Sequence, residues 1–214
     1  MRQQTAGLLG VDESGKGDFF GPLVIAGVVA DEEGEKILSG RGVRDSKLIA
    51  DNRIMELAEW VKDNFPHAVV TIGPEKYNEL YAKIRNLNRL LAWGHCRVIE
   101  NLAEKEAIAQ AVSDKFGKTE YIEKALMEKG KQIPVRQQVR AESLPQVAAA
   151  SILARAQFVR YLQQLSSEYR MTLPKGAGEP VDKAAAEFVR IHGKEALAKV
   201  AKVHFRNFSK LATG

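Results

Sequence analysis

The sequence predicts an α/β layered domain with a mixed sheet and a helical C-terminal appendage. Two apolar, partly β-branched runs near the start of the chain, Leu8–Val11 and Leu23–Ala30, are typical of strands. Segments of helical length then alternate with further short apolar runs. A chain of 214 residues can build a hydrophobic core, and its single cysteine excludes a disulfide framework. We expect one domain over 1–214, with a core over about 1–170 and the appendage over about 180–214.

The remaining elements follow from periodicity. Apolar side chains recur at i, i+3, i+4 and i+7 in Asn52–Asp63, which predicts an amphipathic helix with Asp51 as its N-cap. The other expected strands are Ala68–Ile72, Ala107–Val112 and Ile133–Val139. The other expected helices are Thr119–Lys129 and the longer Asn86–Lys105 and Pro145–Tyr169. A Gly- and Pro-rich loop, Leu173–Pro180, precedes two short helices.

The net charge is concentrated at the C-terminus. Lys and Arg total 32 against 27 Asp and Glu, a net charge of +5, and from residue 183 onward seven basic residues accompany two acidic ones. Such a basic segment suits a polyanion, although a solvated helix face is the plainer alternative. The sequence shows no secretory signal and no apolar run of the ~18 residues that a membrane span needs. We therefore expect a cytoplasmic protein that is not associated with a membrane. We also expect it to be a monomer, with no obligate protein partner.

The Gly-rich stretch Gly10–Pro22 is the most informative segment of the chain. The spacing of Gly15, Gly17 and Gly21 does not fit a dinucleotide-binding loop, and the segment that follows reads as a strand where such loops need a helix. The stretch therefore predicts a hairpin-like turn whose backbone approaches another backbone closely. Lys16 within it is a candidate contact to a phosphate or a sugar edge.

Carboxylates follow three of the predicted strands. They are Asp12 with Glu13, Asp114, and Glu142. Three strand ends that each carry carboxylates suggest an acidic cluster at one edge of the sheet, where open α/β sheets tend to bind ligands. A set of oxygen donors without Cys or His selects Mg²⁺ or Mn²⁺. Enzymes that hydrolyse phosphodiesters commonly use two such ions about 4 Å apart. The plainer interpretation is that Asp12 and Glu13 are solvated turn residues, as an isolated Asp-Glu pair usually is. Consecutive strand residues point to opposite faces, so Glu13 joins Asp12 only at the strand end or through its backbone carbonyl.

Several motifs resemble those of the type 2 ribonucleases H. They are Asp12–Gly17, Asp45–Lys47, Asp114 and the stretch from Glu142 to Arg155. Within that group the chain is more similar to bacterial ribonuclease HIII, through Gly17–Pro22, Asn86–Trp93, Leu173–Ala177 and Lys202–Asn207. The resemblance covers nearly the whole chain. It implies a ribonuclease H-like fold with a mixed, mainly five-stranded sheet flanked by helices. It also implies endonucleolytic cleavage of the RNA strand of RNA/DNA hybrids by two metal ions, Mg²⁺ or Mn²⁺, leaving 5′-phosphate and 3′-hydroxyl ends.

The resemblance also assigns roles to residues. Asp12, Glu13, Asp114 and Glu142 match the family's catalytic, metal-binding quartet, and Glu142 fits the HIII pattern where ribonuclease HII usually has Asp. Asp12 would bridge both ions, Glu13 and Asp114 would serve one, and Glu142 the other. The positions expected to contact substrate are Ser14, Gly15, Lys16, Gly17, Ser46, Lys47, Ser151 and Lys175.

Two departures from the family pattern lead to further expectations. Ribonucleases HIII carry an N-terminal domain resembling the TATA-binding protein, which we expect this chain to lack. Gly176-Ala177 stands where ribonuclease HII has a Gly-Tyr pair, so we expect weak cleavage at single embedded ribonucleotides. The alternatives are a non-catalytic hybrid-binding module, a ribonuclease HII-like junction nuclease, or another two-metal nuclease. The four histidines are interpreted as structural or surface residues, Cys96 as a small buried hydrophobe, and Phe19 and Phe20 as packing beneath the turn.

Overall fold

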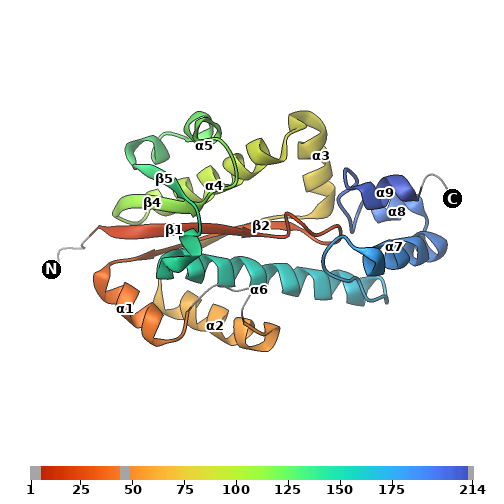
Figure 1. Ribbon diagram of the computed structural model, residues 1–214, viewed down its shortest axis with the longest axis horizontal. Helices are drawn as coiled ribbons and strands as arrows, with labels where there is room; N and C mark the ends of the chain where they lie inside the picture. The colour runs from red at the N-terminus through yellow and green to blue at the C-terminus, as the bar shows by residue number, and fades with distance from the viewer. Residues whose placement is uncertain (1–5, 44–48, 212–214) are drawn as a thin grey trace. The chain divides into compact units, whose positions relative to one another are not determined.

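The computed structural model of the chain describes residues 6–43 and 49–211 (Figure 1). Within these residues, five strands form one sheet. They are β1 (Gly7–Ser14), β2 (Leu23–Ala30), β3 (His67–Ile72), β4 (Ile108–Asp114) and β5 (Val135–Gln138). The expected α/β fold with a mixed, five-stranded sheet and flanking helices is confirmed.

The helices fill the connections between the strands and most of the C-terminal third. They are α1 (Glu32–Gly40), α2 (Asp51–Asn64), α3 (Pro74–Ile84), α4 (Leu87–Ala103), α5 (Thr119–Ala125), α6 (Pro145–Glu168), α7 (Glu179–His192), α8 (Lys194–Leu197) and α9 (Arg206–Lys210), with short 3₁₀ turns η2 (Gly130–Gln132) and η3 (Ala141–Ser143).

The chain divides into two compact units. The first unit comprises Met1–Glu13, Ile25–Val70 and Asn86–Ala156, and the second comprises Ser14–Val24, Thr71–Arg85 and Gln157–Gly214. The first unit contains the sheet core and all four predicted carboxylates. The second contains the Gly-rich turn, α3 and the C-terminal helices. The expected division into 1–170 and 180–214 stays a prediction.

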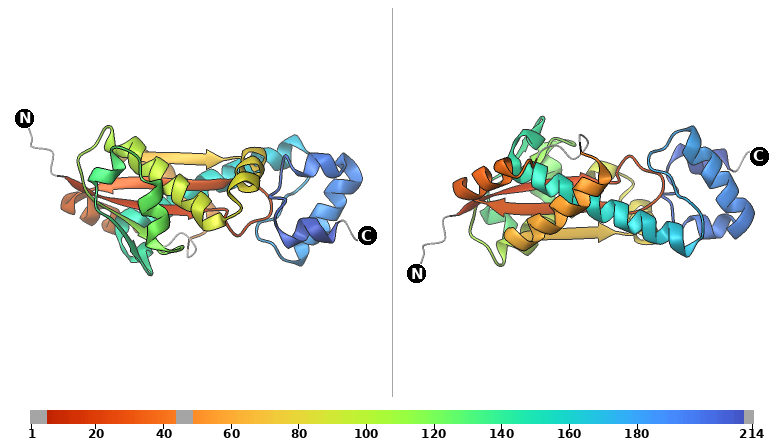
Figure 2. Two further views of the ribbon diagram at one scale, coloured as in Figure 1. Left: turned by 90° about the horizontal axis from the view of Figure 1, so that it is seen from above. Right: turned by 90° about the horizontal axis from the view of Figure 1, so that it is seen from below.

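The sheet order is β3-β2-β1-β4-β5. β1 pairs with β4 in parallel, and β4 pairs with β5 in parallel. β2 is apolar throughout and wholly buried, as expected for a strand covered on both faces. In the first unit, α4 and α5 cover one face of the sheet, while α1, α2 and the beginning of α6 cover the other (Figures 1 and 2).

One glycine brings α6 close to β1. A Cβ at Gly10 would lie 2.2 Å from the carbonyl carbon of Gln146 and 2.3 Å from the nitrogen of Val147. Only glycine allows this approach, since real Cβ atoms do not come so close to a backbone. The first turn of α6 therefore packs directly on β1, two residues before Asp12.

Most expected elements are present with shifted ends. β2 has the predicted bounds, and α6 begins at Pro145 as expected. The prediction of Asp51 as an N-cap is wrong, because Ala50 is the N-cap and the Asp51 carboxylate pairs with Arg155 at 2.9 Å. Helices α1 and α3 were not predicted. The C-terminal part of the described chain holds three helices rather than two short ones, and the first, α7, has 14 residues.

Candidate active site

The parallel register of β1 and β4 places two acidic residues side by side. Val11 is paired with Ser113, so the next position on each strand puts Asp12 opposite Asp114. Asp114 is in turn paired with Gln138 on β5. Because all three strands are parallel here, their C-terminal ends meet at one edge of the sheet, as the sequence predicted.

Asp12 lies in an environment that disfavours its charge. Loss of hydration raises the pKa of Asp12 from its ordinary value of 3.8 to about 7, and the charges of Glu13 and Asp114 contribute to the rise. Two hydrogen bonds to the carboxylate oppose it, one from the backbone N–H of Glu13 at 2.8 Å and one from the Ser151 hydroxyl. Asp12 thus lies beside two further carboxylates of the first unit, Glu13 and Asp114, whose charges oppose its ionisation.

Glu13 has a partner that the sequence did not predict. Its Oε2 atom lies 3.1 Å from Nε2 of His95, and the side chains are 5% and 0% exposed, respectively. In the tautomer that carries a proton on Nε2, His95 donates this hydrogen bond to the Glu13 carboxylate. The His95 ring also packs against Phe116, with centroids 4.6 Å apart. The burial of His95 agrees with its interpretation as a structural residue, and its place on the apolar stripe of α4 indicates that it faces the sheet.

Asp114 connects β4 to the segment that carries Glu142. Its Oδ1 atom accepts a hydrogen bond of 3.2 Å from the backbone N–H of Ala141, the first residue of η3. Glu142 is the next residue and is half-buried. The loop after β4 is held against β5, since Lys115 N–H donates to the Gln138 carbonyl at 3.1 Å. These contacts bring the fourth predicted carboxylate to the neighbourhood of Asp114.

The donor set is suited to a hard divalent cation, but the described residues form no complete metal cage. Across the described part of the chain, no group of three or more His, Cys, Asp or Glu side chains is arranged to hold a metal ion. The Glu13 side chain is instead hydrogen-bonded to His95, and like charges repel one another when no cation lies between them. The carboxylate oxygens of Asp12, Asp114 and Glu142 match the preference of Mg²⁺ and Mn²⁺.

The predicted Gly-rich turn belongs to the second unit. Gly15 has a φ of +89°, and a Cβ there would lie 2.2 Å from the Pro22 carbonyl oxygen, so glycine is required by both conformation and space. Gly17 has open space around it and is exposed, as is Lys16. The expected close approach of two backbones is confirmed, and Phe19 and Phe20 are both 0% exposed.

A second loop is joined to this turn. The backbone N–H of Gly176 donates to the Asp18 carboxylate at 2.6 Å, and Phe19 N–H donates to the Gly176 carbonyl at 2.9 Å. This pairing places Lys175, which is exposed, beside the segment that carries Lys16. The structure therefore brings together two of the predicted substrate contacts within the second unit.

The other predicted positions have different outcomes. Ser46 and Lys47 lie outside the described residues. Ser14 ends β1, directly before the turn. Ser151 is 5% exposed and hydrogen-bonded to Asp12. Cys96 is buried, as expected, and burial raises its pKa to about 12.

The basic C-terminus is less available than its sequence suggests. Of the seven basic residues after position 182, Lys183, Arg190 and Lys210 form ion pairs with carboxylates of the same unit. Lys202 is 0% exposed. Much of the charge that suggested a polyanion-binding surface is therefore neutralised or buried.

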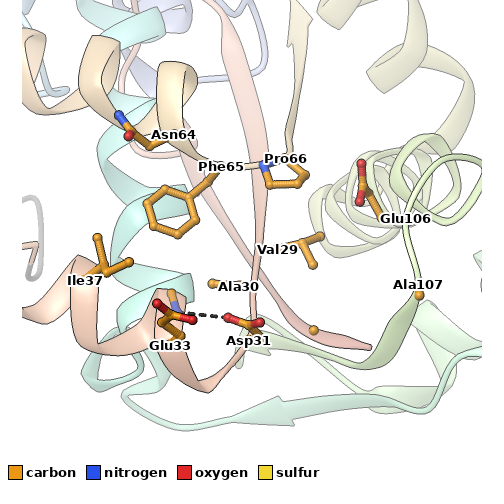
Figure 3. Close-up of a pocket in the computed structure, with 12 residues that line it drawn as sticks. Val29, Ala30, Asp31, Glu33, Ile37, Asn64, Phe65, Pro66, Glu106 and Ala107 are labelled. Atoms are coloured by element: carbon orange, nitrogen blue, oxygen red, sulfur yellow. Dashed lines mark hydrogen bonds between the residues drawn. The ribbon is translucent and has the colours of Figure 1, made fainter. Parts of the chain in front are cut away.

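A hollow of about 330 Å³ lies at the other end of the strands (Figure 3). Gly7 at the start of β1 and Ala107 just before β4 line it, whereas Asp12 and Asp114 are at the opposite strand ends. Its Asp31 carboxylate accepts from Gly34 N–H at 2.9 Å and caps α1. This hollow is thus separate from the carboxylate edge.

Among residues 6–43 and 49–211, no helix has the length and apolar character needed to cross a membrane.

Comparison with known proteins decides the family. The ribonuclease HII family profile, described as "Ribonuclease HII", matches residues 9–208. The chain belongs to the ribonuclease HII family. It is a ribonuclease H, a phosphodiester hydrolase, so the binding-module alternative is set aside.

Relatives and solved structures support the same assignment. The chain is 50% identical to ribonuclease HIII of Chlamydia pneumoniae, over 100% of this chain and 73% of the relative. It is 46% identical to ribonuclease HIII of Chlamydia felis, over 95% of this chain and 69% of the relative. The structure of Bst-RNase HIII in complex with Mn²⁺ superposes with a TM-score of 0.89 at 32% identity, covering 99% of this chain and 71% of that one. The resemblance to ribonuclease HIII is confirmed, while the expected lack of an N-terminal domain stays a prediction.

Proposed function

We propose that the chain hydrolyses the RNA strand of RNA/DNA hybrids endonucleolytically, with two divalent ions, and leaves 5′-phosphate and 3′-hydroxyl ends. The observation that carries the proposal is the pair of carboxylates on adjoining parallel strands, Asp12 and Asp114, with the pKa of Asp12 raised to about 7. Carboxylates that repel one another beside a polyanionic substrate are stabilised when divalent cations bind between them.

The ions would be Mg²⁺ or Mn²⁺, held by Asp12, Asp114 and Glu142. When bound, they would activate the attacking water and stabilise the charge that develops on the scissile phosphate. Mn²⁺ is present in the related Bst-RNase HIII structure. Glu13 would contribute through its backbone carbonyl or by turning away from His95, since its carboxylate is directed to α4.

The chain's own residues would orient these ligands. The Ser151 hydroxyl and the Glu13 N–H fix the Asp12 carboxylate, and the Ala141 N–H fixes that of Asp114. Because Ser151 is 5% exposed, we propose that it acts through Asp12. Such outer contacts commonly change metal affinity 10–100-fold.

The substrate would be bound by the turn Gly15–Gly17, with Lys16 and Lys175 at its phosphates. Glycine amides and carbonyls in an open turn can approach a 2′-hydroxyl, the group that distinguishes RNA from DNA. The open space around Gly17 supports this role. Ser14, Ser46 and Lys47 remain further proposed contacts.

The deciding experiment offers four labelled duplexes with Mg²⁺ or Mn²⁺: RNA/DNA, RNA/RNA, DNA/DNA, and DNA with one embedded ribonucleotide. We expect rapid cleavage of the RNA strand of the hybrid and slow cleavage at the single ribonucleotide. Equal rates on these two would favour a junction nuclease of the ribonuclease HII kind. Cleavage of DNA/DNA at a comparable rate would contradict the proposal. We further propose that the protein acts as a monomer in the cytoplasm.

A further inference from the structure

Lys202 is the most deeply buried cation among the described residues, and neither the catalytic carboxylates nor the proposed substrate contacts account for it. It is 0% exposed and lies in the segment between α8 and α9. Burying an ammonium group is costly unless its protons find acceptors. The position of its partners therefore indicates what the residue is for.

Both side-chain acceptors belong to the Gly-rich stretch. Nζ of Lys202 donates to the backbone carbonyls of Asp18 and Gly21, each at 2.8 Å. Its remaining side faces the ring of Tyr77, with Nζ 5.5 Å from the ring centroid. These carbonyls lie in the segment that follows Gly15–Gly17 directly, so the ammonium fixes the end of the turn without touching its exposed part.

The backbone around Lys202 adds to this connection. Lys202 N–H donates to the Phe19 carbonyl, and Gly21 N–H donates to the Val200 carbonyl, both at 2.9 Å. Lys202 therefore contacts the stretch through both its backbone and its side chain. Burial lowers the pKa of Lys202 from 10.5 to about 7, while the charge of Asp18 opposes that fall.

The segment that presents Lys202 is itself anchored to α3. The Asn78 side chain donates to the carbonyls of Ala198 and Ala201 at 3.0 and 2.9 Å, and it accepts from Val203 N–H at 3.1 Å. The His204 ring stacks on Tyr81 with centroids 3.9 Å apart. Lys202 thus extends from a rigid support to a loop that has little regular structure of its own.

We propose that Lys202 is a positioning residue for substrate binding: it holds the Gly15–Gly21 segment in the shape in which Lys16 and the glycine backbone meet the nucleic acid. The inference rests on the proposed role of the turn in binding the hybrid. It assigns the Lys202 charge to bracing the turn from within, and not to a phosphate of the substrate.

The test compares Lys202→Met with Lys199→Met. Met has nearly the length of Lys but no donors, and Lys199 is an exposed lysine three residues earlier. For Lys202→Met we expect KM for an RNA/DNA hybrid to rise roughly tenfold, with kcat within about twofold of the unchanged chain. Lys199→Met should leave both close to their original values.

Amide hydrogen exchange supplies a readout independent of cleavage. In Lys202→Met, the Phe19 and Gly21 amides should exchange faster, whereas those of Val11 and Ala111 in the sheet should not change. If both variants show the same KM and exchange, the proposal is wrong. It is equally wrong if exchange rises throughout β1 and β4, because Lys202 would then support the whole fold. Absence of hybrid cleavage by the unchanged chain would refute the proposed function instead, and the exchange result would still test the brace.

Discussion

The side chains of Asp12 and Glu13 are adjacent in sequence but have partners on opposite faces of the sheet. Asp12 accepts from Ser151 on α6, and Glu13 accepts from His95 on α4. This is the alternation that β geometry imposes on consecutive residues. At the C-terminal end of β1, Asp12 is therefore directed to α6 and Glu13 to α4.

Replacing Asp12 with Asn should stabilise the metal-free protein while abolishing cleavage. Loss of hydration, together with the like charges of Glu13 and Asp114, raises the pKa of Asp12 from its ordinary value of 3.8 to about 7. A raised pKa means that the folded state binds more protons between those values, so the contribution of Asp12 to stability falls as the pH rises from about 4 to 7. Asp12→Asn should thus melt higher, by roughly 2–4 °C for each kcal/mol gained.

The pH profile checks the cause of that effect. The difference in Tm between Asp12→Asn and the unchanged chain should grow up to about pH 7 and stay constant above it, in the presence of chelator. Added Mn²⁺ should shrink the difference, because the cation compensates the charge in the unchanged chain. A Tm difference that is independent of pH would show that the raised pKa of Asp12 is not the cause.

His95 should influence metal binding through Glu13. The contact with His95 at 3.1 Å fixes Glu13 at the end of β1, and with it the backbone carbonyl that is a proposed ligand. Removing the side chain in His95→Ala should loosen that carbonyl, and we expect Mn²⁺ affinity to fall roughly 10–100-fold. His95→Gln can place an amide N–H near the position of Nε2 and should restore much of that affinity. Calorimetric titration with Mn²⁺ measures both. An equal loss of Mn²⁺ affinity in the two variants would mean that the hydrogen bond from His95 to Glu13 does not support metal binding.

The two glycines of the turn should respond differently to alanine. Gly15→Ala forces a Cβ to within 2.2 Å of the Pro22 carbonyl oxygen at a φ of +89°, so thermal melting should drop by several °C. Gly17→Ala meets no atom within 4 Å and should change stability by less than about 0.5 kcal/mol.

At Gly17, the alanine substitution should weaken substrate binding and leave stability nearly unchanged. Because the backbone there is open to a ligand, a methyl group should raise KM for the hybrid even though the fold is intact. The pair of variants separates conformation from contact. Unchanged KM in Gly17→Ala would contradict the role of the turn in binding.

Local patterns in the sequence predict most of the helices and strands, but they do not predict contacts between side chains that are distant in the sequence. The apolar run Leu23–Ala30 is a strand with the expected bounds because burial on both faces leaves no room for polar residues. Helix α1 was missed because it buries only Gly34 and Leu38, which is too weak an apolar stripe to recognise. Asp51 does not cap α2, because its carboxylate forms an ion pair with Arg155, which is 104 residues away in the sequence.

The same distinction holds at the candidate site. Strand-end carboxylates are visible in the sequence, and the register of β1 with β4 places Asp12 opposite Asp114 as expected. The contact between Glu13 and His95 joins residues 82 positions apart and depends on which face each side chain takes. No local pattern records such a contact, so the ligand geometry could be predicted only as far as the sheet edge.

The most direct test of the central claim is the rate of RNA-strand cleavage in a labelled RNA/DNA hybrid, measured for the unchanged chain and for Asp114→Asn with Mn²⁺ and with excess chelator. Asn keeps the shape of Asp114 and an acceptor for Ala141 N–H but removes its charge. We predict loss of at least about 100-fold for the variant, and for either protein in chelator, with hybrid binding retained. Cleavage at full rate by Asp114→Asn, or by the unchanged chain in excess chelator, would contradict the account.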